Sequence, residues 1–70
     1  MIARKLKAYL DRRGIKYTKM GEAIGVSPQV ASAIVAGRRK LMADELVAIC
    51  DYFEITMDQL KSEELPEGKT

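Results

Sequence analysis

The sequence contains no histidine, no tryptophan and a single cysteine, Cys50. The absence of histidine removes most metal-ligand sets and every histidine-based pair of nucleophile and base, and one cysteine cannot form a disulfide within the chain. These absences argue against an enzyme or a metalloprotein, and they favour a reducing, cytoplasmic setting. We therefore expect no catalytic residues, no metal site and no cofactor, and no small-molecule ligand is evident.

Long apolar runs are also missing, and glycine and proline are scarce. No apolar run approaches the length of a membrane span, and the first residues do not lead into the apolar stretch of a secretory signal. Of the 70 residues, 47% are hydrophobic and 31% are charged, with only five glycines and two prolines. This composition is typical of one small globular domain. Its stability is expected to be marginal, because so short a chain buries only roughly 60% of the surface of its unfolded form.

The charged residues are divided unevenly between the two parts of the chain. Residues 1–40 hold ten basic and two acidic side chains, a net charge of +8, whereas residues 41–70 hold two basic and eight acidic ones, a net charge of −6. A basic segment of this kind is usually presented to a polyanion, of which nucleic acid is the commonest and an anionic membrane surface is the rival. The charge distribution alone is equally compatible with an ordinary solvated surface.

Apolar residues recur at helical spacing along nearly the whole chain, and no segment alternates in the manner of a strand. The predicted helices cover residues 2–13, 17–24, 28–36 and 43–53, and a fifth begins after Thr56. Helices this short are unstable alone, so they must pack against one another. The sequence therefore predicts an all-α fold, a compact bundle of about five short helices, with residues 1–62 as the domain and residues 63–70 as a frayed tail.

The second and third predicted helices are joined by only three residues, Gly25, Val26 and Ser27. Gly25 can take the left-handed conformation that ends a helix, and Ser27 followed by Pro28 is typical of a helix start. Two helices joined by three residues with a glycine at the bend form the helix-turn-helix arrangement. Gly21 lies one turn before the bend, where a very small residue allows the two helices to cross closely.

Several other positions, each weakly specific by itself, extend this motif over roughly residues 2–61. They are Gly14-Ile15, Met20-Gly21, Ile34, Gly37 followed by basic residues, Leu46, Ile49, Phe53, Ile55-Thr56 and Leu60. Taken together with Gly25-Val26-Ser27, they make the chain resemble the DNA-binding domains of the Cro and lambda-repressor type, the XRE family of helix-turn-helix regulators. The chain departs from that family where Gly21 stands in place of alanine, Val35 in place of glutamate and Glu54 in place of glycine.

In such domains the helix after the turn lies in the major groove, and its N-terminal residues touch base edges. The resemblance assigns this base-reading role to Ser27, Pro28, Gln29, Ser32 and Ala33. The amide of Gln29 can pair with N6 and N7 of adenine together, whereas Ser32 can make a single hydrogen bond. This is a thin set of readers, so discrimination is also expected to depend on DNA shape. If the surrounding motif is left out of account, the alternative interpretation is that Gln29 and Ser32 are ordinary exposed helix residues with no role in binding.

The resemblance also implies contacts to the DNA backbone from the start of the second helix, where N–H groups favour an anion, and from the basic loop after the third. The residues it assigns to phosphate are Lys16, Tyr17, Thr18, Lys19, Arg38, Arg39 and Lys40. Arg12 and Arg13, at the end of the first helix, either reach phosphate or interact with the helix dipole.

The resemblance therefore implies a repressor-like regulator of transcription that binds double-stranded DNA in the cytoplasm, at the nucleoid. One domain of this size touches too few base pairs for useful specificity, so a homodimer is expected at least on DNA. Its contact is expected toward the last helix, near Met57, Leu60 and Leu65, because the basic half must face DNA. The alternative is a protein-interaction module, an antirepressor or an adaptor, that kept the fold but lost DNA readout.

Overall fold

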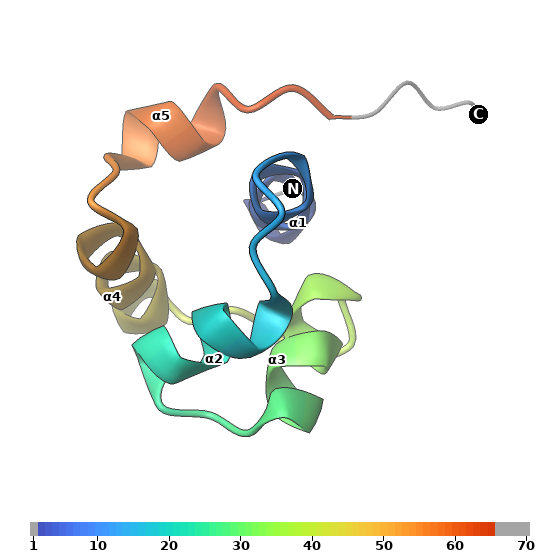
Figure 1. Ribbon diagram of the computed structural model, residues 1–70. Coiled ribbons are helices and arrows are strands. Elements are labelled where there is room, and N and C mark those ends of the chain that lie inside the picture. Colours follow the sequence, from blue (N-terminus) through green and yellow to red (C-terminus); the bar gives the residue numbers. More distant parts are fainter. Residues whose placement is uncertain (1, 66–70) are drawn as a thin grey trace.

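The computed structural model describes residues 2–65, and these residues form five helices and no strand. The helices are α1 (Ile2–Arg12), α2 (Tyr17–Ile24), α3 (Pro28–Val35), α4 (Ala43–Phe53) and α5 (Met57–Lys61). The predicted all-α bundle is confirmed. Figure 1 shows α5 on one side of α1 and the pair α2–α3 on the other, with α4 closing the bundle. None of the helices within residues 2–65 is long and apolar enough to cross a membrane.

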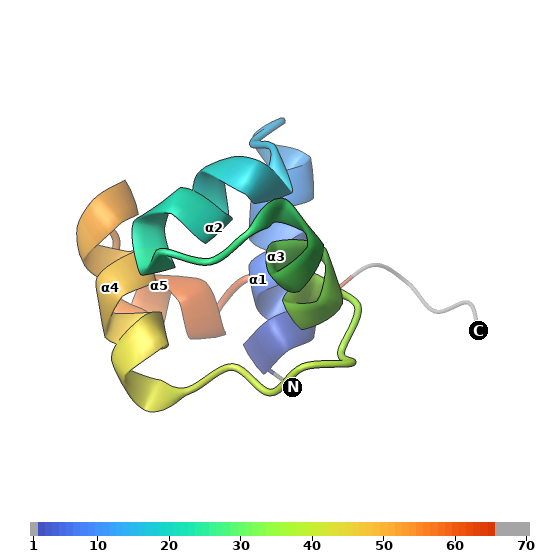
Figure 2. The ribbon, with the colours of Figure 1, turned by 90° about the horizontal axis from the view of Figure 1, so that it is seen from below.

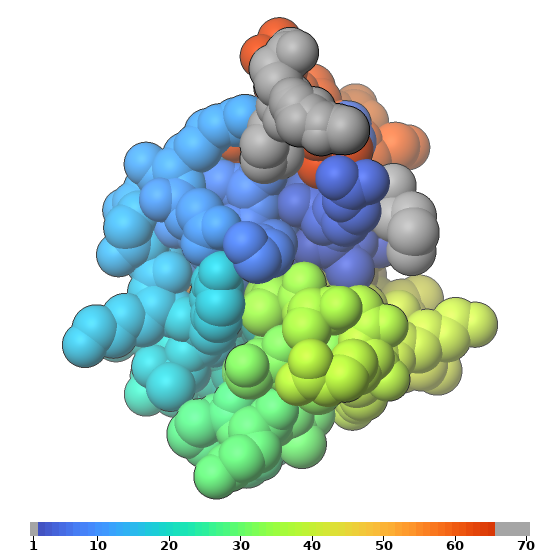
Figure 3. All heavy atoms as spheres, turned by 90° about the vertical axis from the view of Figure 1, so that its right-hand side faces the viewer, coloured from blue at the N-terminus to red at the C-terminus, as the bar shows by residue number. Residues whose placement is uncertain are grey.

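The centre of the core is made by six fully buried side chains that come from all five helices. They are Leu6, Leu10, Met20, Ile34, Ile49 and Leu60. Helix α1 packs against α3 and α5, and α2 packs against α3 and α4; Figure 3 shows α1 as a band between the C-terminal segment and α3. Val35, where the resembled family has glutamate, is 5% exposed and belongs to the same core. Because every helix supplies part of one core, no helix can detach without exposing apolar surface.

The turn between α2 and α3 holds the two helices at a close crossing. Gly25 has a left-handed backbone with φ 73°, and the N–H of Val26 donates to the carbonyl of Gly21 at 3.0 Å. A Cβ placed on Gly21 would lie 3.0 Å from Cβ of Ala31 and 3.2 Å from the carbonyl oxygen of Val26. At these distances a methyl group fits only if Ala31 or the Val26 carbonyl moves by a few tenths of an ångström. A very small residue at Gly21 therefore suits the close crossing, as expected.

Helix α4 ends in a strained residue. Glu54, where the resembled family often has glycine, is left-handed with φ 57° and ψ 47°. For a residue with a Cβ this conformation costs about 1–2 kcal/mol. The strain lies in the short link that carries the chain from α4 into α5.

The segment after α5 packs along α1. Glu63 is 9% exposed, and its carboxylate accepts hydrogen bonds from Nη1 of Arg12 at 2.6 Å and from Nη1 of Arg13 at 3.3 Å. The Arg13 guanidinium also lies 4.0 Å from the centre of the Tyr9 ring. Glu63 is thus part of the packed domain, and its assignment to a frayed tail is corrected. Residues 66–70 of that predicted tail lie outside the described residues.

The ion pairs make Glu63 a source of pH-dependent stability. The hydrogen bond from Arg12, helped by the charges of both arginines, holds the pKa of the Glu63 carboxyl below its ordinary value of about 4.3. A lowered pKa in the folded state means that the stabilisation is complete above the unfolded-state pKa and is lost as pH falls through the folded-state pKa.

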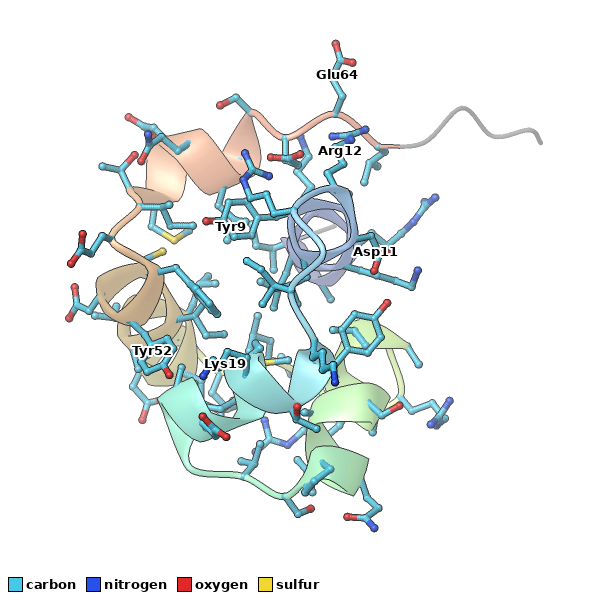
Figure 4. All side chains as sticks on the ribbon, viewed as in Figure 1. Tyr9, Asp11, Arg12, Lys19, Tyr52 and Glu64 are labelled. Carbon is cyan, nitrogen blue, oxygen red and sulfur yellow. The ribbon has the colours of Figure 1, made fainter. Side chains whose placement is uncertain are left out.

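We expect Glu63→Gln to lower the free energy of unfolding by about 1–2 kcal/mol at neutral pH, because two charge-assisted hydrogen bonds lose their anion. Urea unfolding from neutral pH into the acid range should show the difference between parent and variant narrowing as pH falls through the lowered folded-state pKa of Glu63. Glu64→Gln is the matched control, since Glu64 points away from the bundle (Figure 4) and makes no ion pair among residues 2–65. An equal loss in both variants would mean that net charge, rather than this site, sets the effect.

Candidate nucleic-acid interface

Helix α3 has one buried side and one exposed side. Its buried residues are Ala31, Ile34 and Val35. Its exposed N-terminal residues and cap are the predicted base-reading residues Ser27, Pro28, Gln29 and Ser32, and Ala33 is partly exposed. The whole predicted reading set is therefore on one accessible side of one helix.

The start of α3 is fixed by its cap. Oγ of Ser27 accepts the backbone N–H of Val30 at 3.3 Å, and Pro28 occupies the first helical position, where no N–H is required. Gln29 consequently projects from the first turn. In helices that enter the major groove, this turn reaches base edges most deeply.

Two other elements flank α3 on this side of the molecule. Seen from below (Figure 2), α3 lies between α2 and the segment of residues 36–42 that leads to α4. The start of α2 and the 36–42 segment therefore border α3 on two sides.

The helix starts differ in charge. The first turns of α1, α2 and α3 contain no acidic residue, whereas α4 begins with Asp44 and Glu45 and α5 with Asp58. Helix α2 also has no side-chain cap, since its N-cap residue is Lys16. The positive ends of the α2 and α3 dipoles are therefore open to an external anion, and those of α4 and α5 are already neutralised.

Most of the predicted phosphate-binding side chains are accessible. Those that are exposed are Lys16, Thr18, Lys19, Arg38 and Lys40. Within residues 2–65, the one ion pair that any of them makes is the long contact of 3.9 Å between Lys19 and Glu22. The charges of Lys16, Arg38 and Lys40 are thus not neutralised by the described part of the chain.

Tyr17 is directed at α1 instead. Its hydroxyl donates to Oδ1 of Asp11 at 2.7 Å, and Lys7 donates to Oδ2 of the same carboxylate at 2.9 Å. Lys7 first and Tyr17 second lower the pKa of Asp11, and the bond to Asp11 raises the pKa of Tyr17. The Tyr17 hydroxyl therefore uses its one proton in the hydrogen bond to Asp11, which ties α2 to α1, and its phosphate contact stays a prediction.

Arg39 is also engaged within the chain. Its Nη1 and Nη2 lie 2.5 and 2.8 Å from the two carboxylate oxygens of Glu45, which also accepts the N–H of Met42 at 3.0 Å. The hydrogen bonds from Arg39 and then from Met42 lower the pKa of Glu45. Arg39 therefore anchors the 36–42 segment to the start of α4, and its phosphate contact stays a prediction. Sequence reasoning missed Glu45, although its place three residues after the cap is the capping-box spacing.

The residues predicted for a dimer contact do not form one exposed patch. Leu60 is fully buried in the core, so it cannot touch a second copy and its assignment is corrected. Met57 and Leu65 are partly buried.

The sequence left two roles open for Arg12 and Arg13, contact with phosphate or interaction with the helix dipole. In the structure both side chains bind Glu63, and Arg13 also donates to the carbonyl of Tyr9 at 3.3 Å.

Exposed apolar surface gathers on the first half of α4. Met42 and Val47 are 50% and 57% exposed, and Leu46 lines a shallow groove together with Ile2 and Met57. We refer to Met42, Leu46, Val47 and Met57 as the α4 apolar surface.

Comparison with protein families shows that the model described as Cro/C1-type HTH DNA-binding domain matches residues 5–62. The matched range runs from the first turn of α1 to just past the end of α5. No curated protein and no solved structure matches the chain. The family match agrees with the resemblance drawn from the sequence motifs.

The hydroxyl of Tyr17 gives a direct test of the contact between α1 and α2. We expect Tyr17→Phe to lower the free energy of unfolding by about 0.5–1 kcal/mol, because one hydrogen bond to a charged group is removed at a partly exposed site. In a double-mutant cycle with Asp11→Asn, the two losses should be less than additive. Tyr52→Phe is the control, since the Tyr52 hydroxyl has no hydrogen bond within residues 2–65. Additive losses would contradict the assignment.

Proposed function

Because the chain belongs to the Cro/C1-type HTH DNA-binding family, we propose that it is a sequence-specific, repressor-like regulator of transcription that inserts α3 into the major groove of double-stranded DNA. One observation carries the proposal. The exposed side of α3 lies between two elements, the α2 start and the 36–42 segment. These elements present an uncapped helix start and cations, Lys16, Arg38 and Lys40, that make no ion pair within residues 2–65. We propose no catalytic activity for this surface, and we place the protein at the nucleoid.

Base reading falls to a small set of side chains. Gln29 offers the one bidentate amide, which suits adenine, and Ser32 adds a single adaptable hydrogen bond. Pro28 and Ala33 supply apolar contact, for instance to a thymine methyl group. With so few direct readers, part of the specificity comes from the cost of deforming the DNA between contacts.

Phosphate binding divides between the two flanking elements. Lys16, Thr18 and Lys19, together with the free N–H groups of the α2 start, bind phosphates of the DNA strand beside α2. Arg38 and Lys40 serve the strand beside the 36–42 segment, and the Arg39–Glu45 pair keeps this segment in place.

We also propose that two copies bind together on DNA through the α4 apolar surface. Met42 and Val47 are its most exposed members, and the adjoining 36–42 segment belongs to the DNA-facing side. Two copies that meet there could each place α3 in successive major grooves about 34 Å apart. Met57 from the predicted contact is retained in this proposal, and Leu60 is excluded by its burial.

The rival is a protein-interaction module that kept the fold without reading DNA. Selection of bound sites from a pool of random duplexes, carried out at two salt concentrations, separates the two functions. A regulator yields an enriched inverted repeat and an affinity that falls steeply with salt. An interaction module yields no enriched sequence at either concentration.

Gln29 tests base reading. We expect Gln29→Ala to weaken binding to the selected site by about 1–3 kcal/mol and to an unrelated duplex far less, because only the correct base uses the amide. Thermal melts should hardly change, since exposed helix residues contribute little to folding. Equal losses on both duplexes would make Gln29 a backbone contact, and no loss on either would favour the interaction module.

Neighbouring basic residues test the binding of phosphate. Arg38→Ala and Lys40→Ala should each make the slope of log affinity against log salt shallower by ~0.9 for every phosphate that is no longer neutralised, summed over both subunits, without changing the preferred sequence. Arg39→Ala is the matched variant, because Arg39 is neutralised by Glu45: it should lower stability and change the salt slope less than its neighbours do. An equal slope change for all three would mean that Arg39 leaves Glu45 for phosphate.

A further inference from the structure

A groove that the proposed function does not explain opens between α2 and the end of α4. It measures about 600 Å³, within the range of sites that take small molecules. Figure 4 shows Lys19 of α2 and Tyr52 of α4 side by side at its mouth. The groove thus begins where the proposed phosphate contacts of α2 lie, and it continues away from α3 toward α4.

The inner lining of the groove is apolar and aromatic. Ile15 and Phe53 are partly buried against the core, and Tyr52 packs edge-to-face on Phe53 with ring centroids 5.1 Å apart. Tyr52 is 47% exposed and has no place in the core cluster. A half-exposed aromatic ring beside an apolar floor is suited to stacking with a flat ligand.

The rim on the α2 side is cationic. Lys16 has no ion pair within residues 2–65, and Lys19 has only the 3.9 Å contact to Glu22. The first N–H groups of α2 lack intrahelical acceptors, as they do in any helix, and no side chain caps them. A ligand that rests on the aromatic wall and carries one negative group can place that group on these donors.

We propose that this groove binds small aromatic carboxylates. The ring lies on Tyr52 above the floor of Ile15 and Phe53, and the carboxylate meets Lys16 and the α2 start. Glu22 also lines the groove, with its carboxylate 3.9 Å from Nζ of Lys19, and it repels a second negative charge, which favours a single carboxylate over a dianion.

Binding here competes with DNA. Lys16, Thr18 and Lys19 line the groove and are also the proposed phosphate contacts beside α2. A carboxylate seated on them occupies the donors that a phosphate requires. A metabolite of this chemical class that binds in the groove therefore releases the protein from its operator. This competition rests on the proposed function, whereas binding of the carboxylate does not.

The test uses 2-naphthoate as the probe on the isotope-labelled 70-residue chain, with amide chemical shifts as the readout. We expect a dissociation constant of about 0.1–1 mM and shifts centred on Ile15, Lys16 and Thr18, a strength ordinary for a ligand of this size in an open groove. The neutral analogue 2-naphthalenemethanol should bind at least about tenfold more weakly, because it lacks the charge. Shifts no larger than those caused by acetate, or equal binding of the alcohol, would overturn the proposal.

Two variants separate the ring contact from the charge contact. Tyr52→Ser should abolish naphthoate binding, and Lys16→Gln should weaken naphthoate without affecting the alcohol. Ala43→Ser, which alters an exposed residue of the same helix outside the groove, should leave naphthoate binding unchanged. Retained binding in Tyr52→Ser, or loss in Ala43→Ser, would show that the probe binds elsewhere.

DNA binding is measured separately, so that failure of one proposal is distinguishable from failure of the other. With naphthoate at ten times its dissociation constant, the apparent dissociation constant for the selected duplex should rise about tenfold in the parent and not at all in Tyr52→Ser. Naphthoate binding without any effect on DNA affinity would overturn the competition. If naphthoate changes the amide chemical shifts of the groove residues but the chain binds no DNA, the proposed ligand site is supported and the proposed regulatory function is refuted.

Discussion

The close crossing of α2 and α3 is the constraint on which the rest of this structure depends. The crossing is close because Gly21 has no Cβ; a methyl group there would press on Ala31 and on the Val26 carbonyl. The crossing fixes the angle of α3 against the core, and the Ser27 cap fixes where α3 begins. The direction of Gln29 and the spacing between α3 and the lysines of α2 follow from these two features. The proposed reading surface has few polar side chains, so base recognition by it would depend strongly on this placement.

Three carboxylates bind basic side chains within the fold, so these basic side chains are less available to bind a polyanion. Asp11 binds Lys7 and Tyr17, Glu45 binds Arg39, and Glu63 binds Arg12 and Arg13. Each of these carboxylates fastens a connection: α1 to α2, the 36–42 segment to α4, and the C-terminal segment to α1. Within residues 2–65, Lys16, Arg38 and Lys40 have no carboxylate partner and lie on the elements that flank α3. Arg4, Lys5 and Lys61 also lack one, and they lie on α1 and α5. Acids of both halves of the chain therefore bind some of the cations within the fold and leave others without an acidic partner.

The fold was predictable because its signals are local. Gly25, Ser27-Pro28 and the apolar spacing each specify a helix end or a buried face without knowledge of what lies across the core. The side of α3 that faces outward follows from the same spacing, and the family match supports the overall assignment. What sequence reasoning missed are pairings across the fold. The Tyr17–Asp11 and Glu63–Arg12 contacts join residues 6 and 51 positions apart, and no periodicity predicts which carboxylate an arginine will find. Leu60 was misassigned for a related reason, since a leucine on a one-turn helix looks the same whether it faces a core or a partner.

The strain at Glu54 bears on how long such a protein persists in a cell. A left-handed residue with a side chain costs about 1–2 kcal/mol, enough to raise the unfolded fraction roughly tenfold relative to an unstrained link. Proteases remove the unfolded form, so this fraction sets the rate of turnover for a marginally stable chain. A binder that is cleared quickly must be resupplied continuously, and its occupancy then follows its own synthesis closely. The strained backbone of Glu54 thus lowers the stability of the whole domain and raises the fraction of molecules that proteases can remove.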